Sequence, residues 1–121
     1  MQPDRFTVKS QEAVAAAQAL AAERRNSEVT PAHLLVALLR QEEGIAVPIL
    51  QKLNVDVGTL TAEALRAVED LPKLAETAEV RPSSTLVAVL QGAEKEMAKH
   101  GDSYLSVGHL LLALADSEYR Q

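Results

Sequence analysis

The sequence predicts an all-α domain, and three observations support that fold class. Ala and Leu supply most of the apolar residues of a chain that is 47% hydrophobic, and both residues favour helices. Aromatic residues, which strands favour, make up only 2% of the chain. The segment Thr30–Leu38 returns later in the chain as Ser106–Leu114, with five of nine positions identical. We therefore expect one domain that contains two similar helical halves.

Length, charge and composition limit the kind of protein. A chain of 121 residues suits one domain with a buried core. The net charge of -5 argues against nucleic acid or an anionic membrane as a partner, because both bind clustered Lys and Arg. The chain lacks cysteine, and its N-terminal residues lack the apolar run of a secretory signal. We expect a soluble, cytoplasmic protein that binds neither nucleic acid nor membrane.

Apolar spacing predicts two helices in the first part of the chain. The first occupies Thr7–Arg25, with the Thr7 hydroxyl as its N-cap. The second begins at Thr30-Pro31, because a Thr hydroxyl accepts a bond from a free backbone N–H and Pro has no N–H to leave unpaired. The buried stripe of this second helix is rich in leucine. Gly44 is expected to close it in the left-handed conformation.

Two more helices are predicted before Pro72. Pro48 is expected to open the third helix, and Asp56 is expected to cap the fourth. Pro72 stops the fourth helix, because the residue before a proline is pushed away from helical conformation. The residues that follow, Lys73–Arg81, show little periodicity and are predicted to be a connector.

The second half repeats the first helix pair. Pro82-Ser83 is expected to open a fifth helix, which His100-Gly101 closes. Ser106 is expected to cap a sixth helix, which Asp116-Ser117 ends. Counterparts of the third and fourth helices would fall at positions 121–147. The second half is therefore predicted to lack its last two helices.

These boundaries predict a single domain with two unequal repeats. The divisions are residues 1–121 for the domain, 1–72 for repeat one, 73–81 for the connector and 82–121 for repeat two. Because repeat two lacks two helices, apolar side chains near Leu111 and Leu114 are expected to form an exposed patch or to contact a partner chain.

Motifs spread over both halves match one known family. They are Phe6-Thr7 followed by Gln11-Glu12-Ala13, the segment Thr30–Leu35, the step Leu71-Pro72-Lys73, and Gly101–Val107 leading into His109–Leu114. Together these motifs resemble the N-terminal domain of Clp (Hsp100) AAA+ ATPases, most of all in the ClpB disaggregase branch. The resemblance implies a fold of two pseudo-symmetric four-helix repeats.

The resemblance also implies a function. Clp N-terminal domains are joined flexibly to a hexameric AAA+ motor. They bind extended apolar segments of unfolded or aggregated proteins, and they dock adaptor or co-chaperone proteins. Catalysis is not attributed to this domain, so the chain is expected to be no enzyme and to hold no cofactor. ATP is implied for the parent protein alone.

Two positions of this chain match functional positions of the family. The family has a Thr after the leading Phe, an Asp after the Gly of the inter-helix turn, and a Glu just before His-Leu-Leu. Thr7 and Asp102 match the first two and are our predicted substrate-binding residues. Gly108 stands in place of the Glu, which puts any contact of that Glu in doubt. A structural interpretation stays open for both matches, Thr7 as an N-cap and Asp102 as a turn residue that binds backbone N–H groups.

The chain offers little for catalysis or metal binding. His33 and His109 occupy equivalent places in two apolar helices, but three scattered imidazoles without cysteine lack a coordination set. A packing or hydrogen-bonding role in both halves is favoured, and no metal is expected. Neighbouring carboxylates such as Glu42-Glu43 are interpreted as solvated surface. No phosphate loop or Gly-x-Ser-x-Gly elbow occurs, which argues against a helical hydrolase.

Two functions from different classes stay open. The first is a substrate-capture module of a ClpB-type disaggregase. The second is a stand-alone Clp-like adaptor or protein interaction module. Downstream codons for two nucleotide-binding domains would favour the first, and an early stop codon would favour the second.

Overall fold

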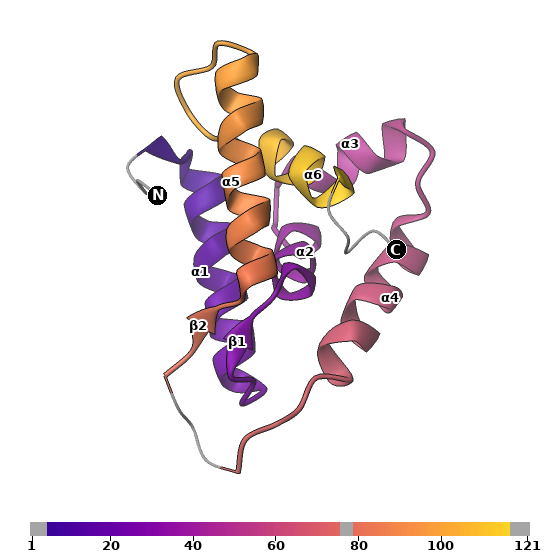
Figure 1. Cartoon of the computed structure of the whole chain (residues 1–121). Coiled ribbons are helices and arrows are strands. Elements are labelled where there is room, and N and C mark those ends of the chain that lie inside the picture. Colours follow the sequence, from indigo (N-terminus) through magenta and orange to yellow (C-terminus); the bar gives the residue numbers. More distant parts are fainter. Residues whose placement is uncertain (1–4, 76–78, 117–121) are drawn as a thin grey trace.

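The computed structural model describes residues 5–75 and 79–116 and confirms the predicted all-α class (Figure 1). The described residues form six helices and one pair of very short strands. Their bounds are α1 Val8–Glu23, β1 Glu28–Val29, α2 Pro31–Leu39, α3 Ala46–Lys52, α4 Val57–Glu69, β2 Arg81–Pro82, α5 Ser84–Lys99 and α6 Val107–Asp116.

Helices α1 and α2 form the core of the first half. The buried positions Ala13, Ala17 and Ala21 of α1 lie four residues apart and so share one helical face. Helix α2 is buried along almost its whole length, from Pro31 to Leu38. The small side chains of α1 allow the leucine-rich α2 to pack closely against it.

Helices α5 and α6 repeat this arrangement in the second half. When Ser106 is aligned with Thr30, the buried positions Val89, Ala93 and Met97 of α5 coincide with the three buried alanines of α1. Positions matched by this alignment are called equivalent below. Helix α6 buries Leu110 and Leu114 against α5 and the rest of the core. Each half therefore buries the same helical positions, as the internal repeat predicts.

Short parallel backbone pairs join the two halves. Strand β1 pairs with β2, with Val29 opposite Pro82. A second pair of the same kind joins Phe6 to Leu105. Phe6 is equivalent to Pro82, and Leu105 is equivalent to Val29. The segment before the second helix of each half therefore binds the segment before the first helix of the other half.

Helices α3 and α4 belong to the first half and reach the second. Helix α4 packs on α2 through Ala64 and Val68, which are both fully buried. Asp56 caps α4 as predicted, since its carboxylate accepts a bond from the Thr59 N–H at 3.1 Å, and this bond lowers the pKa of Asp56. Helix α3 contacts α2, α4 and α6, and Figure 1 shows it at the end of α6. These contacts place α6 beside a wall supplied by the first half.

Two predictions at helix ends are wrong. The left-handed residue after α2 is Glu43, with a φ of 56°, and not Gly44. Gly44 is needed for space instead, because a Cβ at this position would lie 2.7 Å from the Cβ of Gln41. Helix α3 begins at Ala46, so Pro48 does not open the helix but lies in its first turn. Proline has no N–H and is tolerated at each position of the first turn, where N–H groups have no partner within the helix. The position of a proline therefore does not by itself fix the first residue of the helix.

The predicted connector takes part in the fold. Arg81 and Pro82 form β2, so Ser83 alone caps α5, and Pro82 is not its first residue. Further upstream, the N–H of Leu74 donates to the carbonyl of Arg25 at 2.8 Å. A pair of two-residue strands leaves no side-chain periodicity, and the sequence therefore did not predict it.

Some predictions lie outside the described residues. They include Ser117 at the end of the sixth helix and the central part of the predicted connector, residues 76–78. The division of residues 1–121 into repeat one, connector and repeat two stays a prediction. No helix in the part of the chain that the structure describes has the length and apolar character needed to cross a bilayer.

Candidate functional site

Thr7 lies where the two halves meet. Its hydroxyl oxygen accepts a bond from the Ser10 N–H at 3.2 Å, which confirms the predicted N-cap of α1. The N–H of Thr7 donates to the Leu105 carbonyl at 3.0 Å. The residue thus fixes both the start of α1 and the backbone pair that joins the halves.

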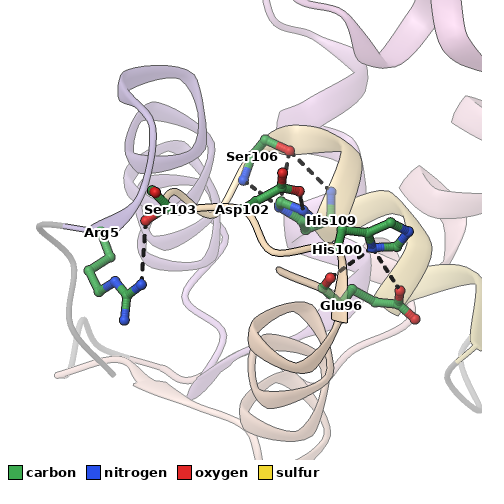
Figure 2. A network of polar contacts seen from close by, with 7 residues as sticks. All are labelled: Arg5, Glu96, His100, Asp102, Ser103, Ser106 and His109. Carbon is green, nitrogen blue, oxygen red and sulfur yellow. Dashed lines mark hydrogen bonds and ion pairs between the residues drawn. The ribbon is translucent and has the colours of Figure 1, made fainter. Parts of the chain in front are cut away.

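Asp102 lies in the turn between α5 and α6. Its N–H donates to the Met97 carbonyl at 3.0 Å. Its carboxylate accepts a bond from Nε2 of His109 at 2.8 Å (Figure 2). The partner of the carboxylate is therefore an imidazole, where the sequence predicted backbone N–H groups. Because the side chain is 49% exposed, the carboxylate also reaches solvent.

Thr7 and Asp102 flank the same junction. Leu105, which accepts the bond from Thr7, lies in the same turn as Asp102. A second link lies beside it, since Nη2 of Arg5 donates to the Ser103 carbonyl at 3.5 Å (Figure 2). The structure therefore brings both predicted binding residues to one edge of the domain.

His109 ties the turn to the start of α6. The Ser106 N–H donates to Nδ1 of His109 at 2.9 Å, so Nδ1 is the acceptor nitrogen. The proton of the neutral ring then lies on Nε2, which donates to Asp102. Oγ of Ser106 accepts a bond from the His109 N–H at 3.4 Å, which confirms Ser106 as the predicted cap. These bonds fix a helix start.

The contacts among Ser106, His109 and Asp102 belong to the start of α6. Oγ of Ser106 lies 3.1 Å from Nδ1 of His109, and the same nitrogen accepts the Ser106 N–H. Among residues 5–75 and 79–116, no three His, Asp or Glu side chains are placed to hold a metal ion.

The first half contains the same cap with a neutral partner. The Thr30 N–H donates to Nδ1 of His33 at 2.9 Å, and Nε2–H donates to Oδ1 of Asn26 at 2.8 Å. Nδ2 of Asn26 donates in turn to the Pro72 carbonyl at 3.2 Å. Burial lowers the pKa of His33 below its ordinary value of 6.5, and the charge of Arg24 lowers it further. The hydrogen-bonding role predicted for both histidines is confirmed.

A large groove runs along α5 and α6. This α5–α6 groove has a volume of about 730 Å³ and is mostly apolar. Its floor and walls include Ala88 and Gly92 of α5, Ala113 of α6, and Ala67 and Leu71 of the first half. The volume lies within the range of ligand pockets.

A second apolar groove lies between α3, α4 and α6. This α3–α6 groove has a volume of about 350 Å³ and is lined by leucines that include Leu53, Leu60 and Leu111. Leu53 and Leu112 on its rim are 68% and 46% exposed. Leu114, which we expected in an exposed patch, lines the groove but is buried. The predicted apolar surface on α6 is therefore a groove shared with the first half.

Neither predicted binding residue lines these grooves. Thr7 and Asp102 lie at the junction of the halves, whereas the grooves lie along the helices. Sequence reasoning missed the α5–α6 groove because its main lining residues are alanine and glycine, which carry no chemical signal. The signal that could have found it is the difference between the two halves at equivalent positions, such as Glu12 against Ala88.

Residues 5–121 match the family described as the Clp repeat (R) N-terminal domain. This chain belongs to the Clp N-terminal domain family. The match includes both halves of the internal repeat. The Clp N-domain is not catalytic.

Relatives of this Clp N-domain include ClpB chaperones. It is 38% identical over 122 residues to the chaperone protein ClpB of Bacillus cereus, a match that covers 98% of this chain and 14% of that protein. The chaperone protein ClpB of Rhodopirellula baltica is 36% identical over 115 residues, a match that covers 95% of this chain and 13% of that protein. The chain thus spans about a seventh of the length of these relatives. The resemblance inferred from the motifs is confirmed.

Solved structures share the fold of this Clp N-domain. The Hsp104 N-terminal domain of Candida albicans aligns with a TM-score of 0.85 and 26% identity, over 93% of this chain and 75% of that one. The N-terminal domain of the ClpV1 ATPase from E. coli EAEC aligns with a TM-score of 0.85 and 24% identity, over 94% of this chain and 69% of that one. The helical arrangement described above is therefore that of Clp N-domains.

Proposed function

We propose that this Clp N-domain is the substrate-capture module of a ClpB-type protein disaggregase. In this role it binds extended apolar segments of unfolded or aggregated proteins. It then passes them to the AAA+ motor of a hexameric, cytoplasmic parent protein, which uses ATP. The observation that carries the proposal is the apolar α5–α6 groove of about 730 Å³ in a chain whose relatives are ClpB chaperones.

Burial of apolar side chains is the proposed source of affinity. Each client side chain that leaves water contributes about 1.5–3 kcal/mol before the cost of ordering the client. Two or three such side chains then give a net affinity in the micromolar to millimolar range. Six copies in a hexamer raise the apparent affinity through effective concentration. Weak binding at each copy also allows the client to be released to the motor.

A relative supports peptide binding by this fold. A ClpV N-domain that aligns with a TM-score of 0.72 has been solved in complex with a VipB peptide. We extend peptide binding to this chain, with unfolded polypeptides as the main partners and adaptor or co-chaperone proteins as further ones. Nucleic acid and membranes are not among the proposed partners, because the chain carries a net charge of -5.

We assign Thr7 and Asp102 a role in client binding at the junction of the halves, outside the α5–α6 groove. Thr7→Ala removes a cap at the junction of the halves, and Ser83→Ala removes the equivalent cap of α5, so the two form a matched pair. Thr7→Ala and Asp102→Asn are expected to weaken client binding about threefold, with Ser83→Ala nearer to wild type. Equal effects of Thr7→Ala and Ser83→Ala at equal loss of stability would remove the assignment.

The test of the function is binding of a permanently unfolded protein. Fluorescently labelled casein is titrated with the isolated chain, and anisotropy gives the dissociation constant. We expect saturable binding in the micromolar to millimolar range that a folded, polar protein does not compete for. An absence of binding at millimolar concentration of the domain would contradict the proposal.

A stand-alone adaptor is the second candidate function. It shares the interaction surface and lacks the motor. Sequencing of the gene beyond codon 121 separates the two functions, because a disaggregase requires two nucleotide-binding domains with phosphate loops downstream. An early stop codon would favour the adaptor.

A further inference from the structure

The turn after α1 holds the segment that follows α4. Nδ2 of Asn26 donates to the Pro72 carbonyl at 3.2 Å, and the Leu74 N–H donates to the Arg25 carbonyl at 2.8 Å. We call these two bonds the α4 latch. Figure 1 shows that the held segment begins a long connection from α4 to β2. The α4 latch therefore fixes where this connection starts.

Ion pairs beside the α4 latch are more exposed than the latch itself. Arg24 forms an ion pair with Glu69 at the end of α4, and Lys73 pairs with the same carboxylate at 3.6 Å. The Glu69 side chain is 46% exposed, so water weakens both pairs. Asn26, by contrast, is buried. We therefore take Asn26 as the principal side chain that holds the segment.

His33 sets the direction of the Asn26 amide. Nε2–H of His33 donates to Oδ1 of Asn26 at 2.8 Å, which leaves the Nδ2 hydrogens to reach Pro72. On the other side of the ring, Nδ1 accepts the N–H of Thr30 at 2.9 Å. One chain of bonds thus runs from the start of α2 through the ring to the segment after α4. It requires the neutral ring, because Nδ1 must accept while Nε2 donates.

A second proton on the ring breaks this chain at Nδ1. The imidazolium carries a hydrogen on both nitrogens, so Nδ1 can no longer accept the Thr30 N–H. The Thr30 hydroxyl, 2.9 Å from Nδ1, can accept the new hydrogen, but the backbone N–H of Thr30 then loses its partner. Because His33 is fully buried, neither this N–H nor the charged ring meets water. Protonation therefore favours a form in which the ring or the turn has moved toward solvent.

The charges around His33 do not stabilise the imidazolium. Of the helices that pack on α2, α1 ends beside the positive charge of Arg24, and burial together with this charge lowers the pKa of His33 below 6.5. The Glu69 carboxylate of α4 is paired with Arg24 and not with the ring. No charge on the described residues of α3, α5 or α6 shifts the pKa of His33. The folded site therefore offers the imidazolium no counter-ion of its own.

The second half has the opposite arrangement. Asp102 is equivalent to Asn26, and its carboxylate accepts the bond from Nε2–H of His109 at 2.8 Å. A protonated His109 therefore keeps a charged partner, and water reaches the side chain of that partner. The carboxylate has no hydrogen to donate, so Asp102 cannot hold a carbonyl as Asn26 holds that of Pro72. The second half thus provides a matched control for the first.

We propose that the α4 latch is operated by acid: protonation of His33 releases the segment after α4 from the turn after α1, while α1 and α2 stay packed on each other. This inference does not depend on what the domain binds. Its effect reaches the α5–α6 groove, because Ala67 and Leu71, just before the released Pro72, line that groove. The wall that the first half adds to the groove is fixed when His33 is neutral and loosened when it is charged.

The amide hydrogen of Leu74 reports the state of the α4 latch, because it donates to the Arg25 carbonyl. Amide exchange measured by NMR between about pH 8 and pH 5 gives its protection factor, with the amide of Val36 in the buried α2 as the reference. We expect the protection of Leu74 to fall about tenfold with acid, and the fall at Val36 to be at least about threefold smaller. Constant protection at Leu74, or equal losses at both amides, would overturn the inference.

His33→Gln and His109→Gln are matched variants of the two halves. Gln at the third helical position after a Ser or Thr cap forms a capping box, so each variant keeps a partner for the N–H at the helix start and loses the titrating ring. His33→Gln is expected to abolish the acid-induced fall at Leu74, and His109→Gln to leave it as in wild type. A fall that persists in His33→Gln, or that His109→Gln also abolishes, would contradict the assignment of His33 as the sensor.

Asn26→Ala separates the α4 latch from its sensor. The variant lacks the amide that holds Pro72, so Leu74 should be weakly protected already at about pH 8 and should respond less than about threefold to acid. Circular dichroism establishes that each variant is folded. If a variant does not fold, wild type alone decides: the fall at Leu74 must share its midpoint with the titration of the His33 ring in the same spectra. Midpoints more than about one pH unit apart would overturn the inference.

Discussion

His33 and His109 occupy equivalent positions in the two halves, and each accepts a bond at Nδ1 from the backbone N–H at the start of its helix. Their other partners differ. Nε2 of His33 donates to Asn26, which is 2% exposed, whereas Nε2 of His109 donates to Asp102, whose side chain is 49% exposed. A neutral amide stands where the site is dry, and a carboxylate stands where it reaches water.

The two halves share the bond that His33 and His109 accept at Nδ1 and differ in the partner at Nε2. The bond at Nδ1 caps a helix in both halves, so the fold requires it twice. The partner at Nε2 follows the local environment, because an ionised carboxylate is costly to bury and an amide is not charged.

The largest effect on stability is expected at the buried histidine. His33→Ala leaves the Thr30 N–H unpaired in a dry site and creates a cavity, so it should lower the free energy of unfolding by about 3 kcal/mol. His109→Ala should cost about half as much, because water reaches its half-exposed partner Asp102. Urea unfolding measures both. A larger loss for His109→Ala would contradict the contrast between the halves.

The left-handed residues after α1 and α5 form a second pair. Gly101 has a φ of 69°, and the equivalent Arg25 has a φ of 55°. Gly101→Ala is expected to lower the free energy of unfolding by about 1 kcal/mol, because a Cβ disfavours this conformation. Arg25→Gly is expected to raise it by up to about 1 kcal/mol at the same place in the first half. Thermal unfolding measures the stability of both variants. Changes of the same sign in the two variants would contradict the prediction.

A smaller effect is expected inside the helices. Gly92→Ala should raise the free energy of unfolding by about 0.5–1 kcal/mol, because alanine favours a helix more than glycine does and the new Cβ fits against Ala113. The reverse change at the equivalent position, Ala16→Gly, should lower it by a similar amount. Chemical unfolding curves with unchanged slopes provide the comparison. A loss of stability in Gly92→Ala would mean that the space above Gly92 is filled.

His33 in the first half should contribute a pH dependence to the stability near neutral pH. The pKa of His33 lies below 6.5 in the folded chain, so the unfolded chain binds more protons once the pH falls through 6.5. The free energy of unfolding should therefore fall as the pH drops from about 6.5, until the pH reaches the folded pKa. NMR titration of the His33 ring and urea unfolding between about pH 8 and pH 5 test this. His33→Gln should be less stable at pH 8 and should show a flatter pH dependence; an unchanged slope would contradict it.

Most of the helices could be predicted because their signals are local. Apolar spacing marked the helices, and the hydroxyl or carboxylate caps at Thr7, Asp56 and Ser106 were correct. The start of α3 and the left-handed Glu43 could not be predicted, because tertiary packing decides between neighbouring residues there. The reciprocal pairs across the halves depend on backbone groups alone, which every residue but proline carries in full.

The candidate site could be predicted only in part. The equivalent histidines and the caps follow from the internal repeat, but the repeat does not show that Asn26 is a buried partner of His33. The α5–α6 groove is lined in part by alanine and glycine, whose role appears only when helices from both halves come together. Thr7 and Asp102 were taken from a family resemblance, and their role in binding stays a prediction.

Chemical-shift mapping tests most directly whether this Clp N-domain binds clients in the α5–α6 groove. Unlabelled lysine-flanked apolar peptide is titrated into the isotope-labelled chain, and backbone amide shifts are followed to saturation. We predict that the largest changes fall on α5 around Gly92 and on α6 around Ala113, with little change at the equivalent Ala16 and Ala37. Equal changes along both helix pairs, or changes confined to α1 and α2, would contradict the account.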